Sequence, residues 1–155
     1  ITLGQRHILF EMGETELICR RLEGDFLDYK NAIPRRNPIS VTVDTKAMLE
    51  SLDRVSVVIS EKLKSPVRCI FEQDRVLLSA KTANGDAKDV CRIDGDGQGL
   101  EIGFNNRYLM DALRFAPADE LKLELNTGIS PAILVPTDGE ESFLYMVLPV
   151  RLKAQ

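Results

Sequence analysis

The chain has 155 residues, and its 20 Lys and Arg against 24 Asp and Glu give a net charge of −4 at pH 7. This length suits one domain, or one domain and a fragment of another. Hydrophobic residues make up 44% of the chain, which permits a sizeable core and argues against intrinsic disorder. No apolar run approaches the ~18 residues of a membrane helix. The acidic balance excludes a uniformly basic nucleic-acid binder.

The N-terminal part predicts a small β-structure followed by a linker. We expect two strands within residues 1–22, namely residues 1–10 and Glu16–Leu22, with a turn at Met12–Glu14. Two strands cannot support a core, so this segment belongs with something N-terminal or packs on the residues after it. Residues 23–38 are rich in Gly, Pro, Asp and Asn and predict a linker. Because the chain begins with Ile1, we expect it to be a piece of a longer protein.

From Ile39 the sequence predicts a strand, a helix and three further strands. Val41 and Val43 alternate with polar residues, and Asp44 or Thr45 can cap a helix that runs to about Ser60. Three more strands and a Gly-rich turn come next. Their expected ranges are Val67–Glu72, Arg75–Lys81 and Lys88–Ile93 for the strands and Asp94–Gly99 for the turn.

The second half of the chain repeats this order. Residues 100–104 predict a strand, Asn105 or Asn106 can cap a helix to about Phe115, and Pro117 ends it. Three strands come after it, at Leu121–Leu125, Ala132–Val135 and Phe143–Leu152. The repeated strand–helix–three-strand unit predicts an α+β fold, in which two helices lie on one side of antiparallel sheets.

Residues for catalysis or metal binding are scarce. His7 is the single histidine, and it has no partner pattern for a metal or a catalytic group. Cys19, Cys69 and Cys91 show no Cys-x-x-Cys spacing, which predicts reduced structural thiols in a cytosolic protein. The glycines of Asp94–Gly99 precede a strand, whereas a dinucleotide-binding loop opens a helix. We therefore predict a protein that is not an enzyme and has no metal or cofactor.

Two surfaces remain as candidates for function. Residues 144–152 are apolar at nearly every position, which fits either a partly exposed binding groove or a strand buried on both faces. The polar sides of the two helices hold Lys46, Arg54, Arg107 and Arg114. These cations fit either a strip that contacts DNA phosphates or ordinary helix ion pairs, such as Arg107 with Asp111.

Three stretches of the sequence resemble one family, the bacterial sliding clamps that are the beta subunit of DNA polymerase III. These stretches are Leu22–Tyr29, Ile102–Asn105 with its following helix (Tyr108, Asp111, Leu113), and Tyr145–Leu152. By this resemblance, residues 1–28 would be the end of the clamp's middle domain and a linker. Residues 29–152 would be the third domain, and residues 153–155 a tail.

The resemblance implies a non-enzymatic ring. Such clamps are head-to-tail homodimers when full length, encircle duplex DNA of any sequence and tether the replicative polymerase, the clamp loader and other proteins that contain a clamp-binding motif. They work in the bacterial cytoplasm at the nucleoid. The implied DNA-facing residues are Lys46, Arg54, Arg107 and Arg114, and the implied ring interface includes Val57, Val58 and an edge strand at Lys88–Ile93.

The resemblance also implies a pocket for partner peptides. Its third-domain side would consist of Leu27, Asn31, Ala32, Leu63, Asn105, Tyr108, Ile129, Pro131, Met146, Val147, Leu148, Pro149, Val150, Arg151 and Leu152. Leu27 replaces a common proline, and Asn31 replaces a usual basic residue. Two alternatives stay open, an unrelated duplicated α+β peptide-binding adaptor without a DNA role and, less favoured, a small enzyme.

Overall fold

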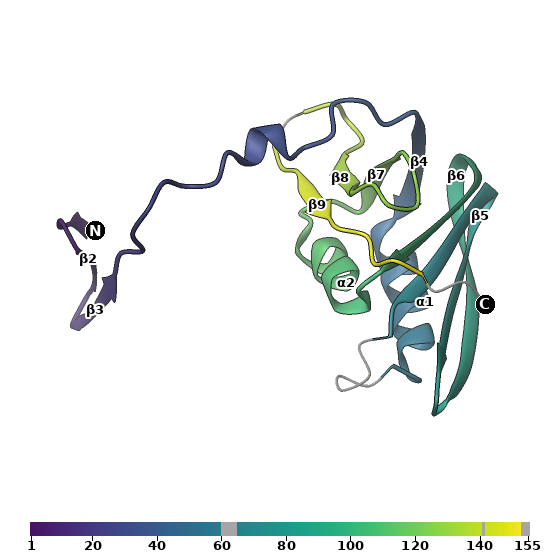
Figure 1. Cartoon of the computed structure of the whole chain (residues 1–155), viewed down its shortest axis with the longest axis horizontal. Helices are drawn as coiled ribbons and strands as arrows, with labels where there is room; N and C mark the ends of the chain where they lie inside the picture. Colours follow the sequence, from purple (N-terminus) through teal and green to yellow (C-terminus); the bar gives the residue numbers. More distant parts are fainter. Residues whose placement is uncertain (60–64, 141, 153–155) are drawn as a thin grey trace. The chain divides into compact units, whose positions relative to one another are not determined.

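The computed structural model describes residues 1–59, 65–140 and 142–152 (Figure 1). The backbone contacts divide the chain into two compact units, Ile1–Ala32 and Ile33–Gln155. This division falls close to the predicted domain boundary at residues 28 and 29. The assignment of the two parts to two clamp domains stays a prediction. Leu63 and the tail of residues 153–155 lie outside the described residues.

The smaller unit is a three-stranded antiparallel sheet followed by an extended segment. Its strands are β1 (Thr2–Leu3), β2 (His7–Met12) and β3 (Thr15–Arg20), and a 3-10 turn η1 covers Tyr29–Asn31. The single strand expected over residues 1–10 is therefore wrong, because the amide of Gly4 donates to the carbonyl of His7 and closes a turn between β1 and β2. Ile1, Leu3, Leu17 and Ile18 are exposed, so this sheet buries no core of its own.

The larger unit contains a six-stranded sheet in the order β5-β6-β4-β7-β8-β9, in which every pairing is antiparallel. Two helices accompany it. These elements are β4 (Ile39–Asp44), α1 (Thr45–Ser56), β5 (Val67–Thr82), β6 (Gly85–Phe104), α2 (Asn106–Phe115), β7 (Glu120–Leu125), β8 (Ala132–Pro136) and β9 (Tyr145–Val147). The predicted α+β class with antiparallel strands is confirmed.

The strand boundaries in the first repeat differ from the prediction. β5 runs through both strands expected at Val67–Glu72 and Arg75–Lys81, and Asp74 takes a positive φ of 58° where the pairing shifts register. The turn expected at Asp94–Gly99 is wrong, because β6 continues through it. Its glycines allow the strand to bend and to approach its neighbour, since a Cβ on Gly97 would collide with Phe71.

Both helices begin at the predicted caps. The side chain of Asp44 accepts a 2.7 Å hydrogen bond from the amide of Ala47, and the side chain of Asn105 accepts one of 3.1 Å from the amide of Arg107. α1 ends at Ser56, earlier than expected, and the residue expected as its end, Ser60, lies outside the described residues. α1 packs against α2 and against β4, β5 and β6 (Figure 1).

The core lies between the helices and the sheet. Met48, Leu52 and Val55 of α1 are fully buried, as are Leu109 and Leu113 of α2. The polar sides of both helices are thereby directed away from the sheet. Thr45 adds one long-range polar contact, because its hydroxyl donates to the carbonyl of Ala118 at 2.9 Å and joins the start of α1 to the approach to β7.

Candidate functional site

The C-terminal segment lies against the end of β6. After β9 the chain forms a bridge between Phe104 and Pro149, and the amide of Val150 donates a 2.7 Å hydrogen bond to the carbonyl of Gly103. A Cβ on Gly103 would lie 2.6 Å from Leu152 Cδ2 and 2.7 Å from the Val150 carbonyl oxygen. Only glycine therefore permits this close approach, and the position of the C-terminal segment depends on it.

This segment is partly exposed, in contrast to a strand buried on both faces. Val147 is buried, but Leu148 is 61% exposed, and Pro149, Val150 and Leu152 are half-buried. Arg151 is exposed. The segment therefore presents apolar surface next to β9.

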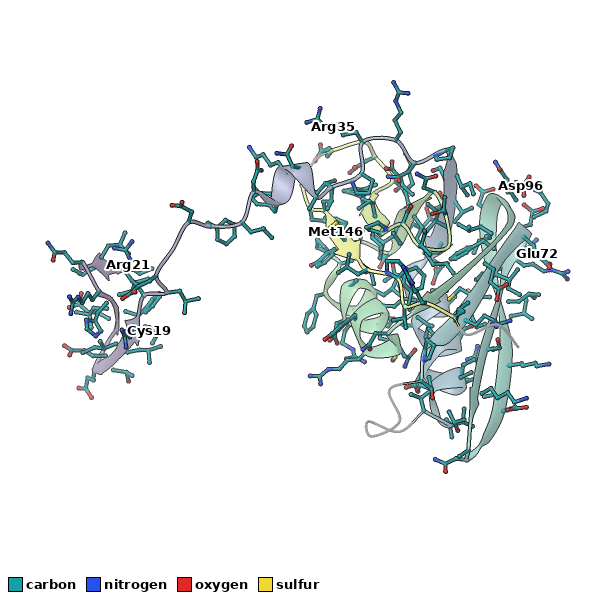
Figure 2. All side chains as sticks on the ribbon, viewed as in Figure 1. Cys19, Arg21, Arg35, Glu72, Asp96 and Met146 are labelled. Atoms are coloured by element: carbon teal, nitrogen blue, oxygen red, sulfur yellow. The ribbon has the colours of Figure 1, made fainter. Side chains whose placement is uncertain are left out.

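Other predicted pocket residues lie near this segment through the pairing of neighbouring elements. Ala132 pairs with Val147, which brings the preceding Pro131 and Ile129 to the same end of the sheet as Leu148. α2 packs on β9, where Met146 lies half-buried (Figure 2), and Tyr108 in the first turn of this helix is 62% exposed. Asn105 is occupied as the cap of α2.

The remaining predicted pocket residues belong to the smaller unit or lie outside the described residues. Leu27, Asn31 and Ala32 are exposed residues of the smaller unit. The side-chain amide of Asn31 donates a 2.6 Å hydrogen bond to the carboxylate of Asp28. Leu63 lies outside the described residues.

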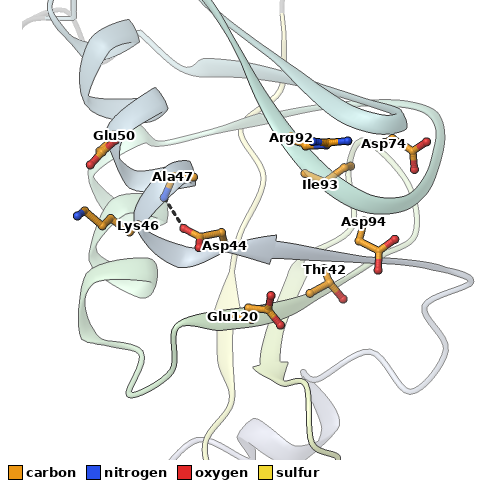
Figure 3. Close-up of a pocket in the computed structure, with 10 residues that line it drawn as sticks. All are labelled: Thr42, Asp44, Lys46, Ala47, Glu50, Asp74, Arg92, Ile93, Asp94 and Glu120. Carbon is orange, nitrogen blue, oxygen red and sulfur yellow. Dashed lines mark hydrogen bonds between the residues drawn. The ribbon is translucent and has the colours of Figure 1, made fainter.

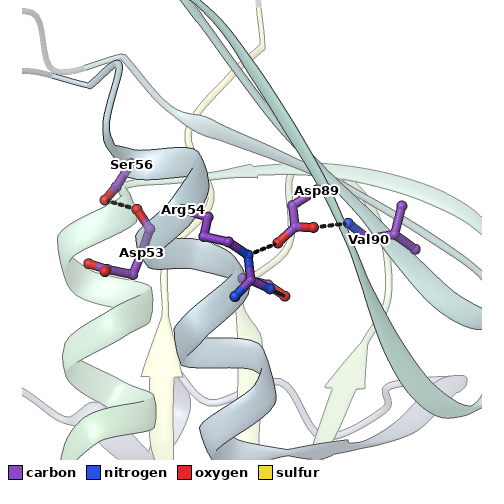
Figure 4. Close-up of polar contacts among 6 residues, drawn as sticks. Asp53, Arg54, Ser56, Asp89 and Val90 are labelled. Atoms are coloured by element: carbon purple, nitrogen blue, oxygen red, sulfur yellow. Dashed lines mark hydrogen bonds and ion pairs between the residues drawn. The ribbon is translucent and has the colours of Figure 1, made fainter.

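Three of the four predicted DNA-facing cations are in ion pairs. Arg54 Nε donates to Asp89 Oδ2 at 2.7 Å (Figure 4). Arg107 and Arg114 share one carboxylate, that of Asp111, at 3.8 and 3.5 Å. Lys46 is exposed and has no ion pair among the described residues.

The charge on the exposed sides of the two helices is unequal. α1 has two cations, Lys46 and Arg54, against two carboxylates, Glu50 and Asp53. α2 has two cations against the single carboxylate of Asp111 and is therefore net positive by one charge. A surface that attracts phosphates is thus favoured on α2 over α1.

The predicted ring-interface residues occur where α1 ends. Val57 is 83% exposed, and the carbonyl of the half-buried Val58 accepts a 2.9 Å hydrogen bond from the hydroxyl of Thr82. Residues 85–92 of β6 pair with β5 on one side and with no other strand of the described chain. This open edge includes the predicted edge strand and presents Val90, which is 55% exposed.

Asp89 is a residue on this edge whose carboxyl pKa departs from its ordinary value. Partial burial alone raises the pKa of its carboxyl. Three neighbours together outweigh burial and lower the pKa of Asp89: the Val90 amide through its hydrogen bond, Arg54 through its hydrogen bond and charge, and the Ser51 side chain.

Burial raises the pKa of the thiols of Cys69 and Cys91, which disfavours the reactive thiolate.

An open cleft of about 860 Å³ lies beside the first turn of α1 (Figure 3). Its lining contains five carboxylates and two cations, and Ala47 and Ile93 are the apolar residues among those that line it. The lining residues are Thr42, Asp44, Lys46, Ala47, Glu50, Asp74, Arg92, Ile93, Asp94 and Glu120. This composition suits neither an apolar peptide anchor nor a phosphate group.

Residues 1–59, 65–140 and 142–152 contain no group of three or more His, Cys, Asp or Glu that could hold a metal ion. Within these same residues no helix is both long and apolar enough to cross a membrane.

The predicted stretches Lys88–Ile93 and Ile102–Asn105 contain Asp89, Val90 and Gly103, but the sequence assigned these three residues no individual role. The pairing of Arg54 with Asp89 joins residues far apart in the sequence, so no helix spacing indicates it. Val90 alternates with Lys88 and Arg92 on one face of the strand, and an apolar residue on the polar face of an edge strand is the local signal for this surface.

Comparison with solved structures defines the class of protein to which this fold belongs. A DNA polymerase III beta subunit from Pseudomonas aeruginosa matches with a TM-score of 0.86 at 28% identity, over 97% of this chain and 41% of that one. A sliding clamp from Bartonella birtlesii, solved bound to griselimycin, matches with a TM-score of 0.85 at 28% identity, over 97% and 40% of the two chains. The fold is that of the sliding clamps.

Sequence comparison gives the family. The profile described as DNA polymerase III beta subunit, C-terminal domain, matches residues 30–151. A beta sliding clamp of Synechocystis sp. is 32% identical over 154 residues, which are 98% of this chain and 39% of that protein. One from Staphylococcus aureus is 31% identical over 97% of this chain and 40% of its own length. The chain belongs to the DNA polymerase III beta subunit family and spans about 40% of the length of these relatives.

This assignment confirms the predicted resemblance and the clamp fold. It also favours a clamp over the unrelated adaptor. Membership of a family of sliding clamps, rather than any absence in the structure, supports the prediction that the chain is not an enzyme.

Proposed function

We propose that this chain is part of a sliding clamp that encircles duplex DNA and gives a replicative polymerase its processivity without chemistry of its own. The observation that supports this most strongly is the match of residues 30–151 to the C-terminal domain of the beta-subunit family. Because the chain spans about 40% of its relatives, the proposal concerns the full-length protein. Its site of action would be the bacterial cytoplasm, at the nucleoid.

The proposed partner site is an apolar surface around the C-terminal segment. Tyr108, Ile129 and Leu148 are each more than 60% exposed, which is unusual for large apolar side chains. An apolar anchor of a linear peptide from the polymerase, the clamp loader or another replication protein would contact them. Surrounding half-buried residues, such as Met146 and Pro149, would exclude water from the contact.

The proposed DNA contact is made through phosphates only. A clamp must slide over any sequence, so base readout would hinder it. Arg107 and Arg114 share one carboxylate and retain a net positive charge, which supports α2 as the main contact. The proposed homodimer forms through Val57, Val58 and the open edge of β6.

A topological experiment tests this function. The full-length protein is loaded by its clamp loader onto nicked circular DNA, and the circle is then linearised. A sliding ring is expected to stay on the circle and to slide off the linear ends. Equal retention on both forms would contradict encirclement and would favour the peptide-binding adaptor.

A further inference from the structure

Two polar contacts join the end of α1 to the β5–β6 hairpin. Arg54 Nε donates to Asp89 Oδ2 at 2.7 Å, and just beyond the end of α1 the carbonyl of Val58 accepts a 2.9 Å hydrogen bond from the hydroxyl of Thr82. The first contact connects the helix to β6, and the second connects it to the end of β5. The end of the helix is thus fastened to both strands of the hairpin.

The Arg54–Asp89 contact has a defined geometry rather than that of a loose surface pair. The second carboxylate oxygen of Asp89 accepts a 2.8 Å hydrogen bond from the amide of Val90. Arg54 Nη2 donates at 2.9 Å to the hydroxyl of Ser51, which is only 2% exposed. Both charged side chains are therefore held by additional partners as well as by each other (Figure 4).

The two contacts lie next in sequence to two exposed apolar residues, Val90 on the open edge and Val57 at the end of α1. Val90 directly follows Asp89, and Val57 directly precedes Val58. In this part of the molecule β6 pairs only with β5. α1 also packs on β5 and β6 through the buried core, and the two polar contacts add directional connections between the hairpin and the end of α1.

We propose that Arg54 and Asp89 are positioning residues for the interface between two copies of the full-length chain. They hold Val90 and the open edge of β6 at a fixed place relative to Val57, so a second copy meets a preformed surface. Preorganisation of this kind lowers the ordering cost of association. The inference rests on the ring interface proposed above, and it removes Arg54 from the residues that contact DNA.

The test compares the dimer affinity of full-length variants with their thermal stability. Asp89→Asn, Arg54→Gln and the double variant are each diluted, and the dimer dissociation constant is measured by sedimentation velocity. Each single variant is expected to raise that constant about tenfold, and the double variant no more than the larger single effect. The Arg54 side chain is 58% exposed, so solvent screens the pair, and Tm should fall by less than about 4 °C.

Two controls make the outcome decisive. Arg68→Gln breaks a comparable ion pair, that of Arg68 with Glu101 at 2.9 Å, outside the open edge of residues 85–92, and should leave the dimer dissociation constant unchanged. Val57→Glu should dissociate the dimer if the proposed interface is correct. A constant within about twofold of wild type for both Asp89→Asn and Arg54→Gln, while Val57→Glu dissociates the dimer, would overturn the positioning role alone.

The other outcomes also separate the two proposals. A dimer that survives Val57→Glu would overturn the interface itself, and the positioning role with it. If the single effects multiply in the double variant, the two side chains act independently, and the positioning role is again overturned. A loss of salt-dependent DNA retention in Arg54→Gln, with an unchanged dimer, would return Arg54 to the DNA contacts.

Discussion

The amide of Val150 donates a 2.7 Å hydrogen bond to the carbonyl of Gly103, and no side chain fits between the two backbones. The apolar C-terminal segment is therefore positioned by a residue at the end of β6, just before α2. A change at Gly103 should act at a distance on peptide binding.

Gly103→Ala is expected to displace the C-terminal segment, because the new methyl group would contact Leu152 and the Val150 carbonyl. Strain of this kind typically costs about 1–3 kcal/mol of folding stability. In the full-length protein we expect a lower Tm and a weaker affinity for a clamp-binding peptide, measured by calorimetry and fluorescence polarisation. Asp94→Asn, at an exposed position on the same strand, is the control. An unchanged Tm and an unchanged peptide affinity in Gly103→Ala would show that the C-terminal segment adjusts without cost to the added methyl group.

Tyr108→Ala and Leu148→Ala should each weaken binding of a clamp-binding peptide by tenfold or more, roughly the effect of a typical hot-spot residue. Both side chains are more than 60% exposed, so Tm should change little. Phe115→Ala is a matched control, since Phe115 lies on the same helix and is 67% exposed but is not among the predicted pocket residues. Equal losses in all three variants would argue against a localised pocket.

Arg107→Glu combined with Arg114→Glu should reduce retention of the loaded ring on circular DNA at low salt. Each phosphate contact contributes roughly 0.9 to the slope of log affinity against log salt, so loss of two contacts should lower the slope by roughly two. Peptide binding should stay intact. If neither retention nor its salt dependence changes, the two arginines are not DNA contacts.

The lowered pKa of Asp89 predicts a pH dependence of the dimer. A carboxyl whose folded-state pKa is depressed stabilises the structure above its unfolded value, near 3.8, and this contribution disappears as pH falls through the lower folded pKa. The ionisation of Asp89 should therefore leave the dimer dissociation constant unchanged between about pH 5 and 8. The difference in dimer dissociation constant between wild type and Asp89→Asn should narrow as pH falls through the lowered pKa of Asp89. A difference that stays constant while NMR shows the Asp89 carboxyl becoming protonated would contradict the assigned role of the charge.

Local signals were sufficient for the helices and insufficient for the long strands. Asp44 and Asn105 cap the helices as predicted, because capping depends on residues within one turn. The glycines of residues 94–99 fit either a turn or a bend within a strand. Because β6 pairs with Phe71 and Gln73 of β5, the strand continues and bends. The Arg54–Asp89 contact depends on the same long-range pairing, so no spacing in the sequence could reveal it.

The same continuous strand has a consequence for how the molecule unfolds. The two sequence repeats meet inside β6, where Asp96 pairs with Gln73 and Asp94 pairs with Thr42, so one strand completes the sheet of both halves. Each repeat would lose ladder pairs if the other melted, because residues 67–71 of β5 pair with residues 100–104 of β6 and β4 pairs along its length with β7. The larger unit should therefore lose its structure in one cooperative step, although its sequence reads as two copies of one motif.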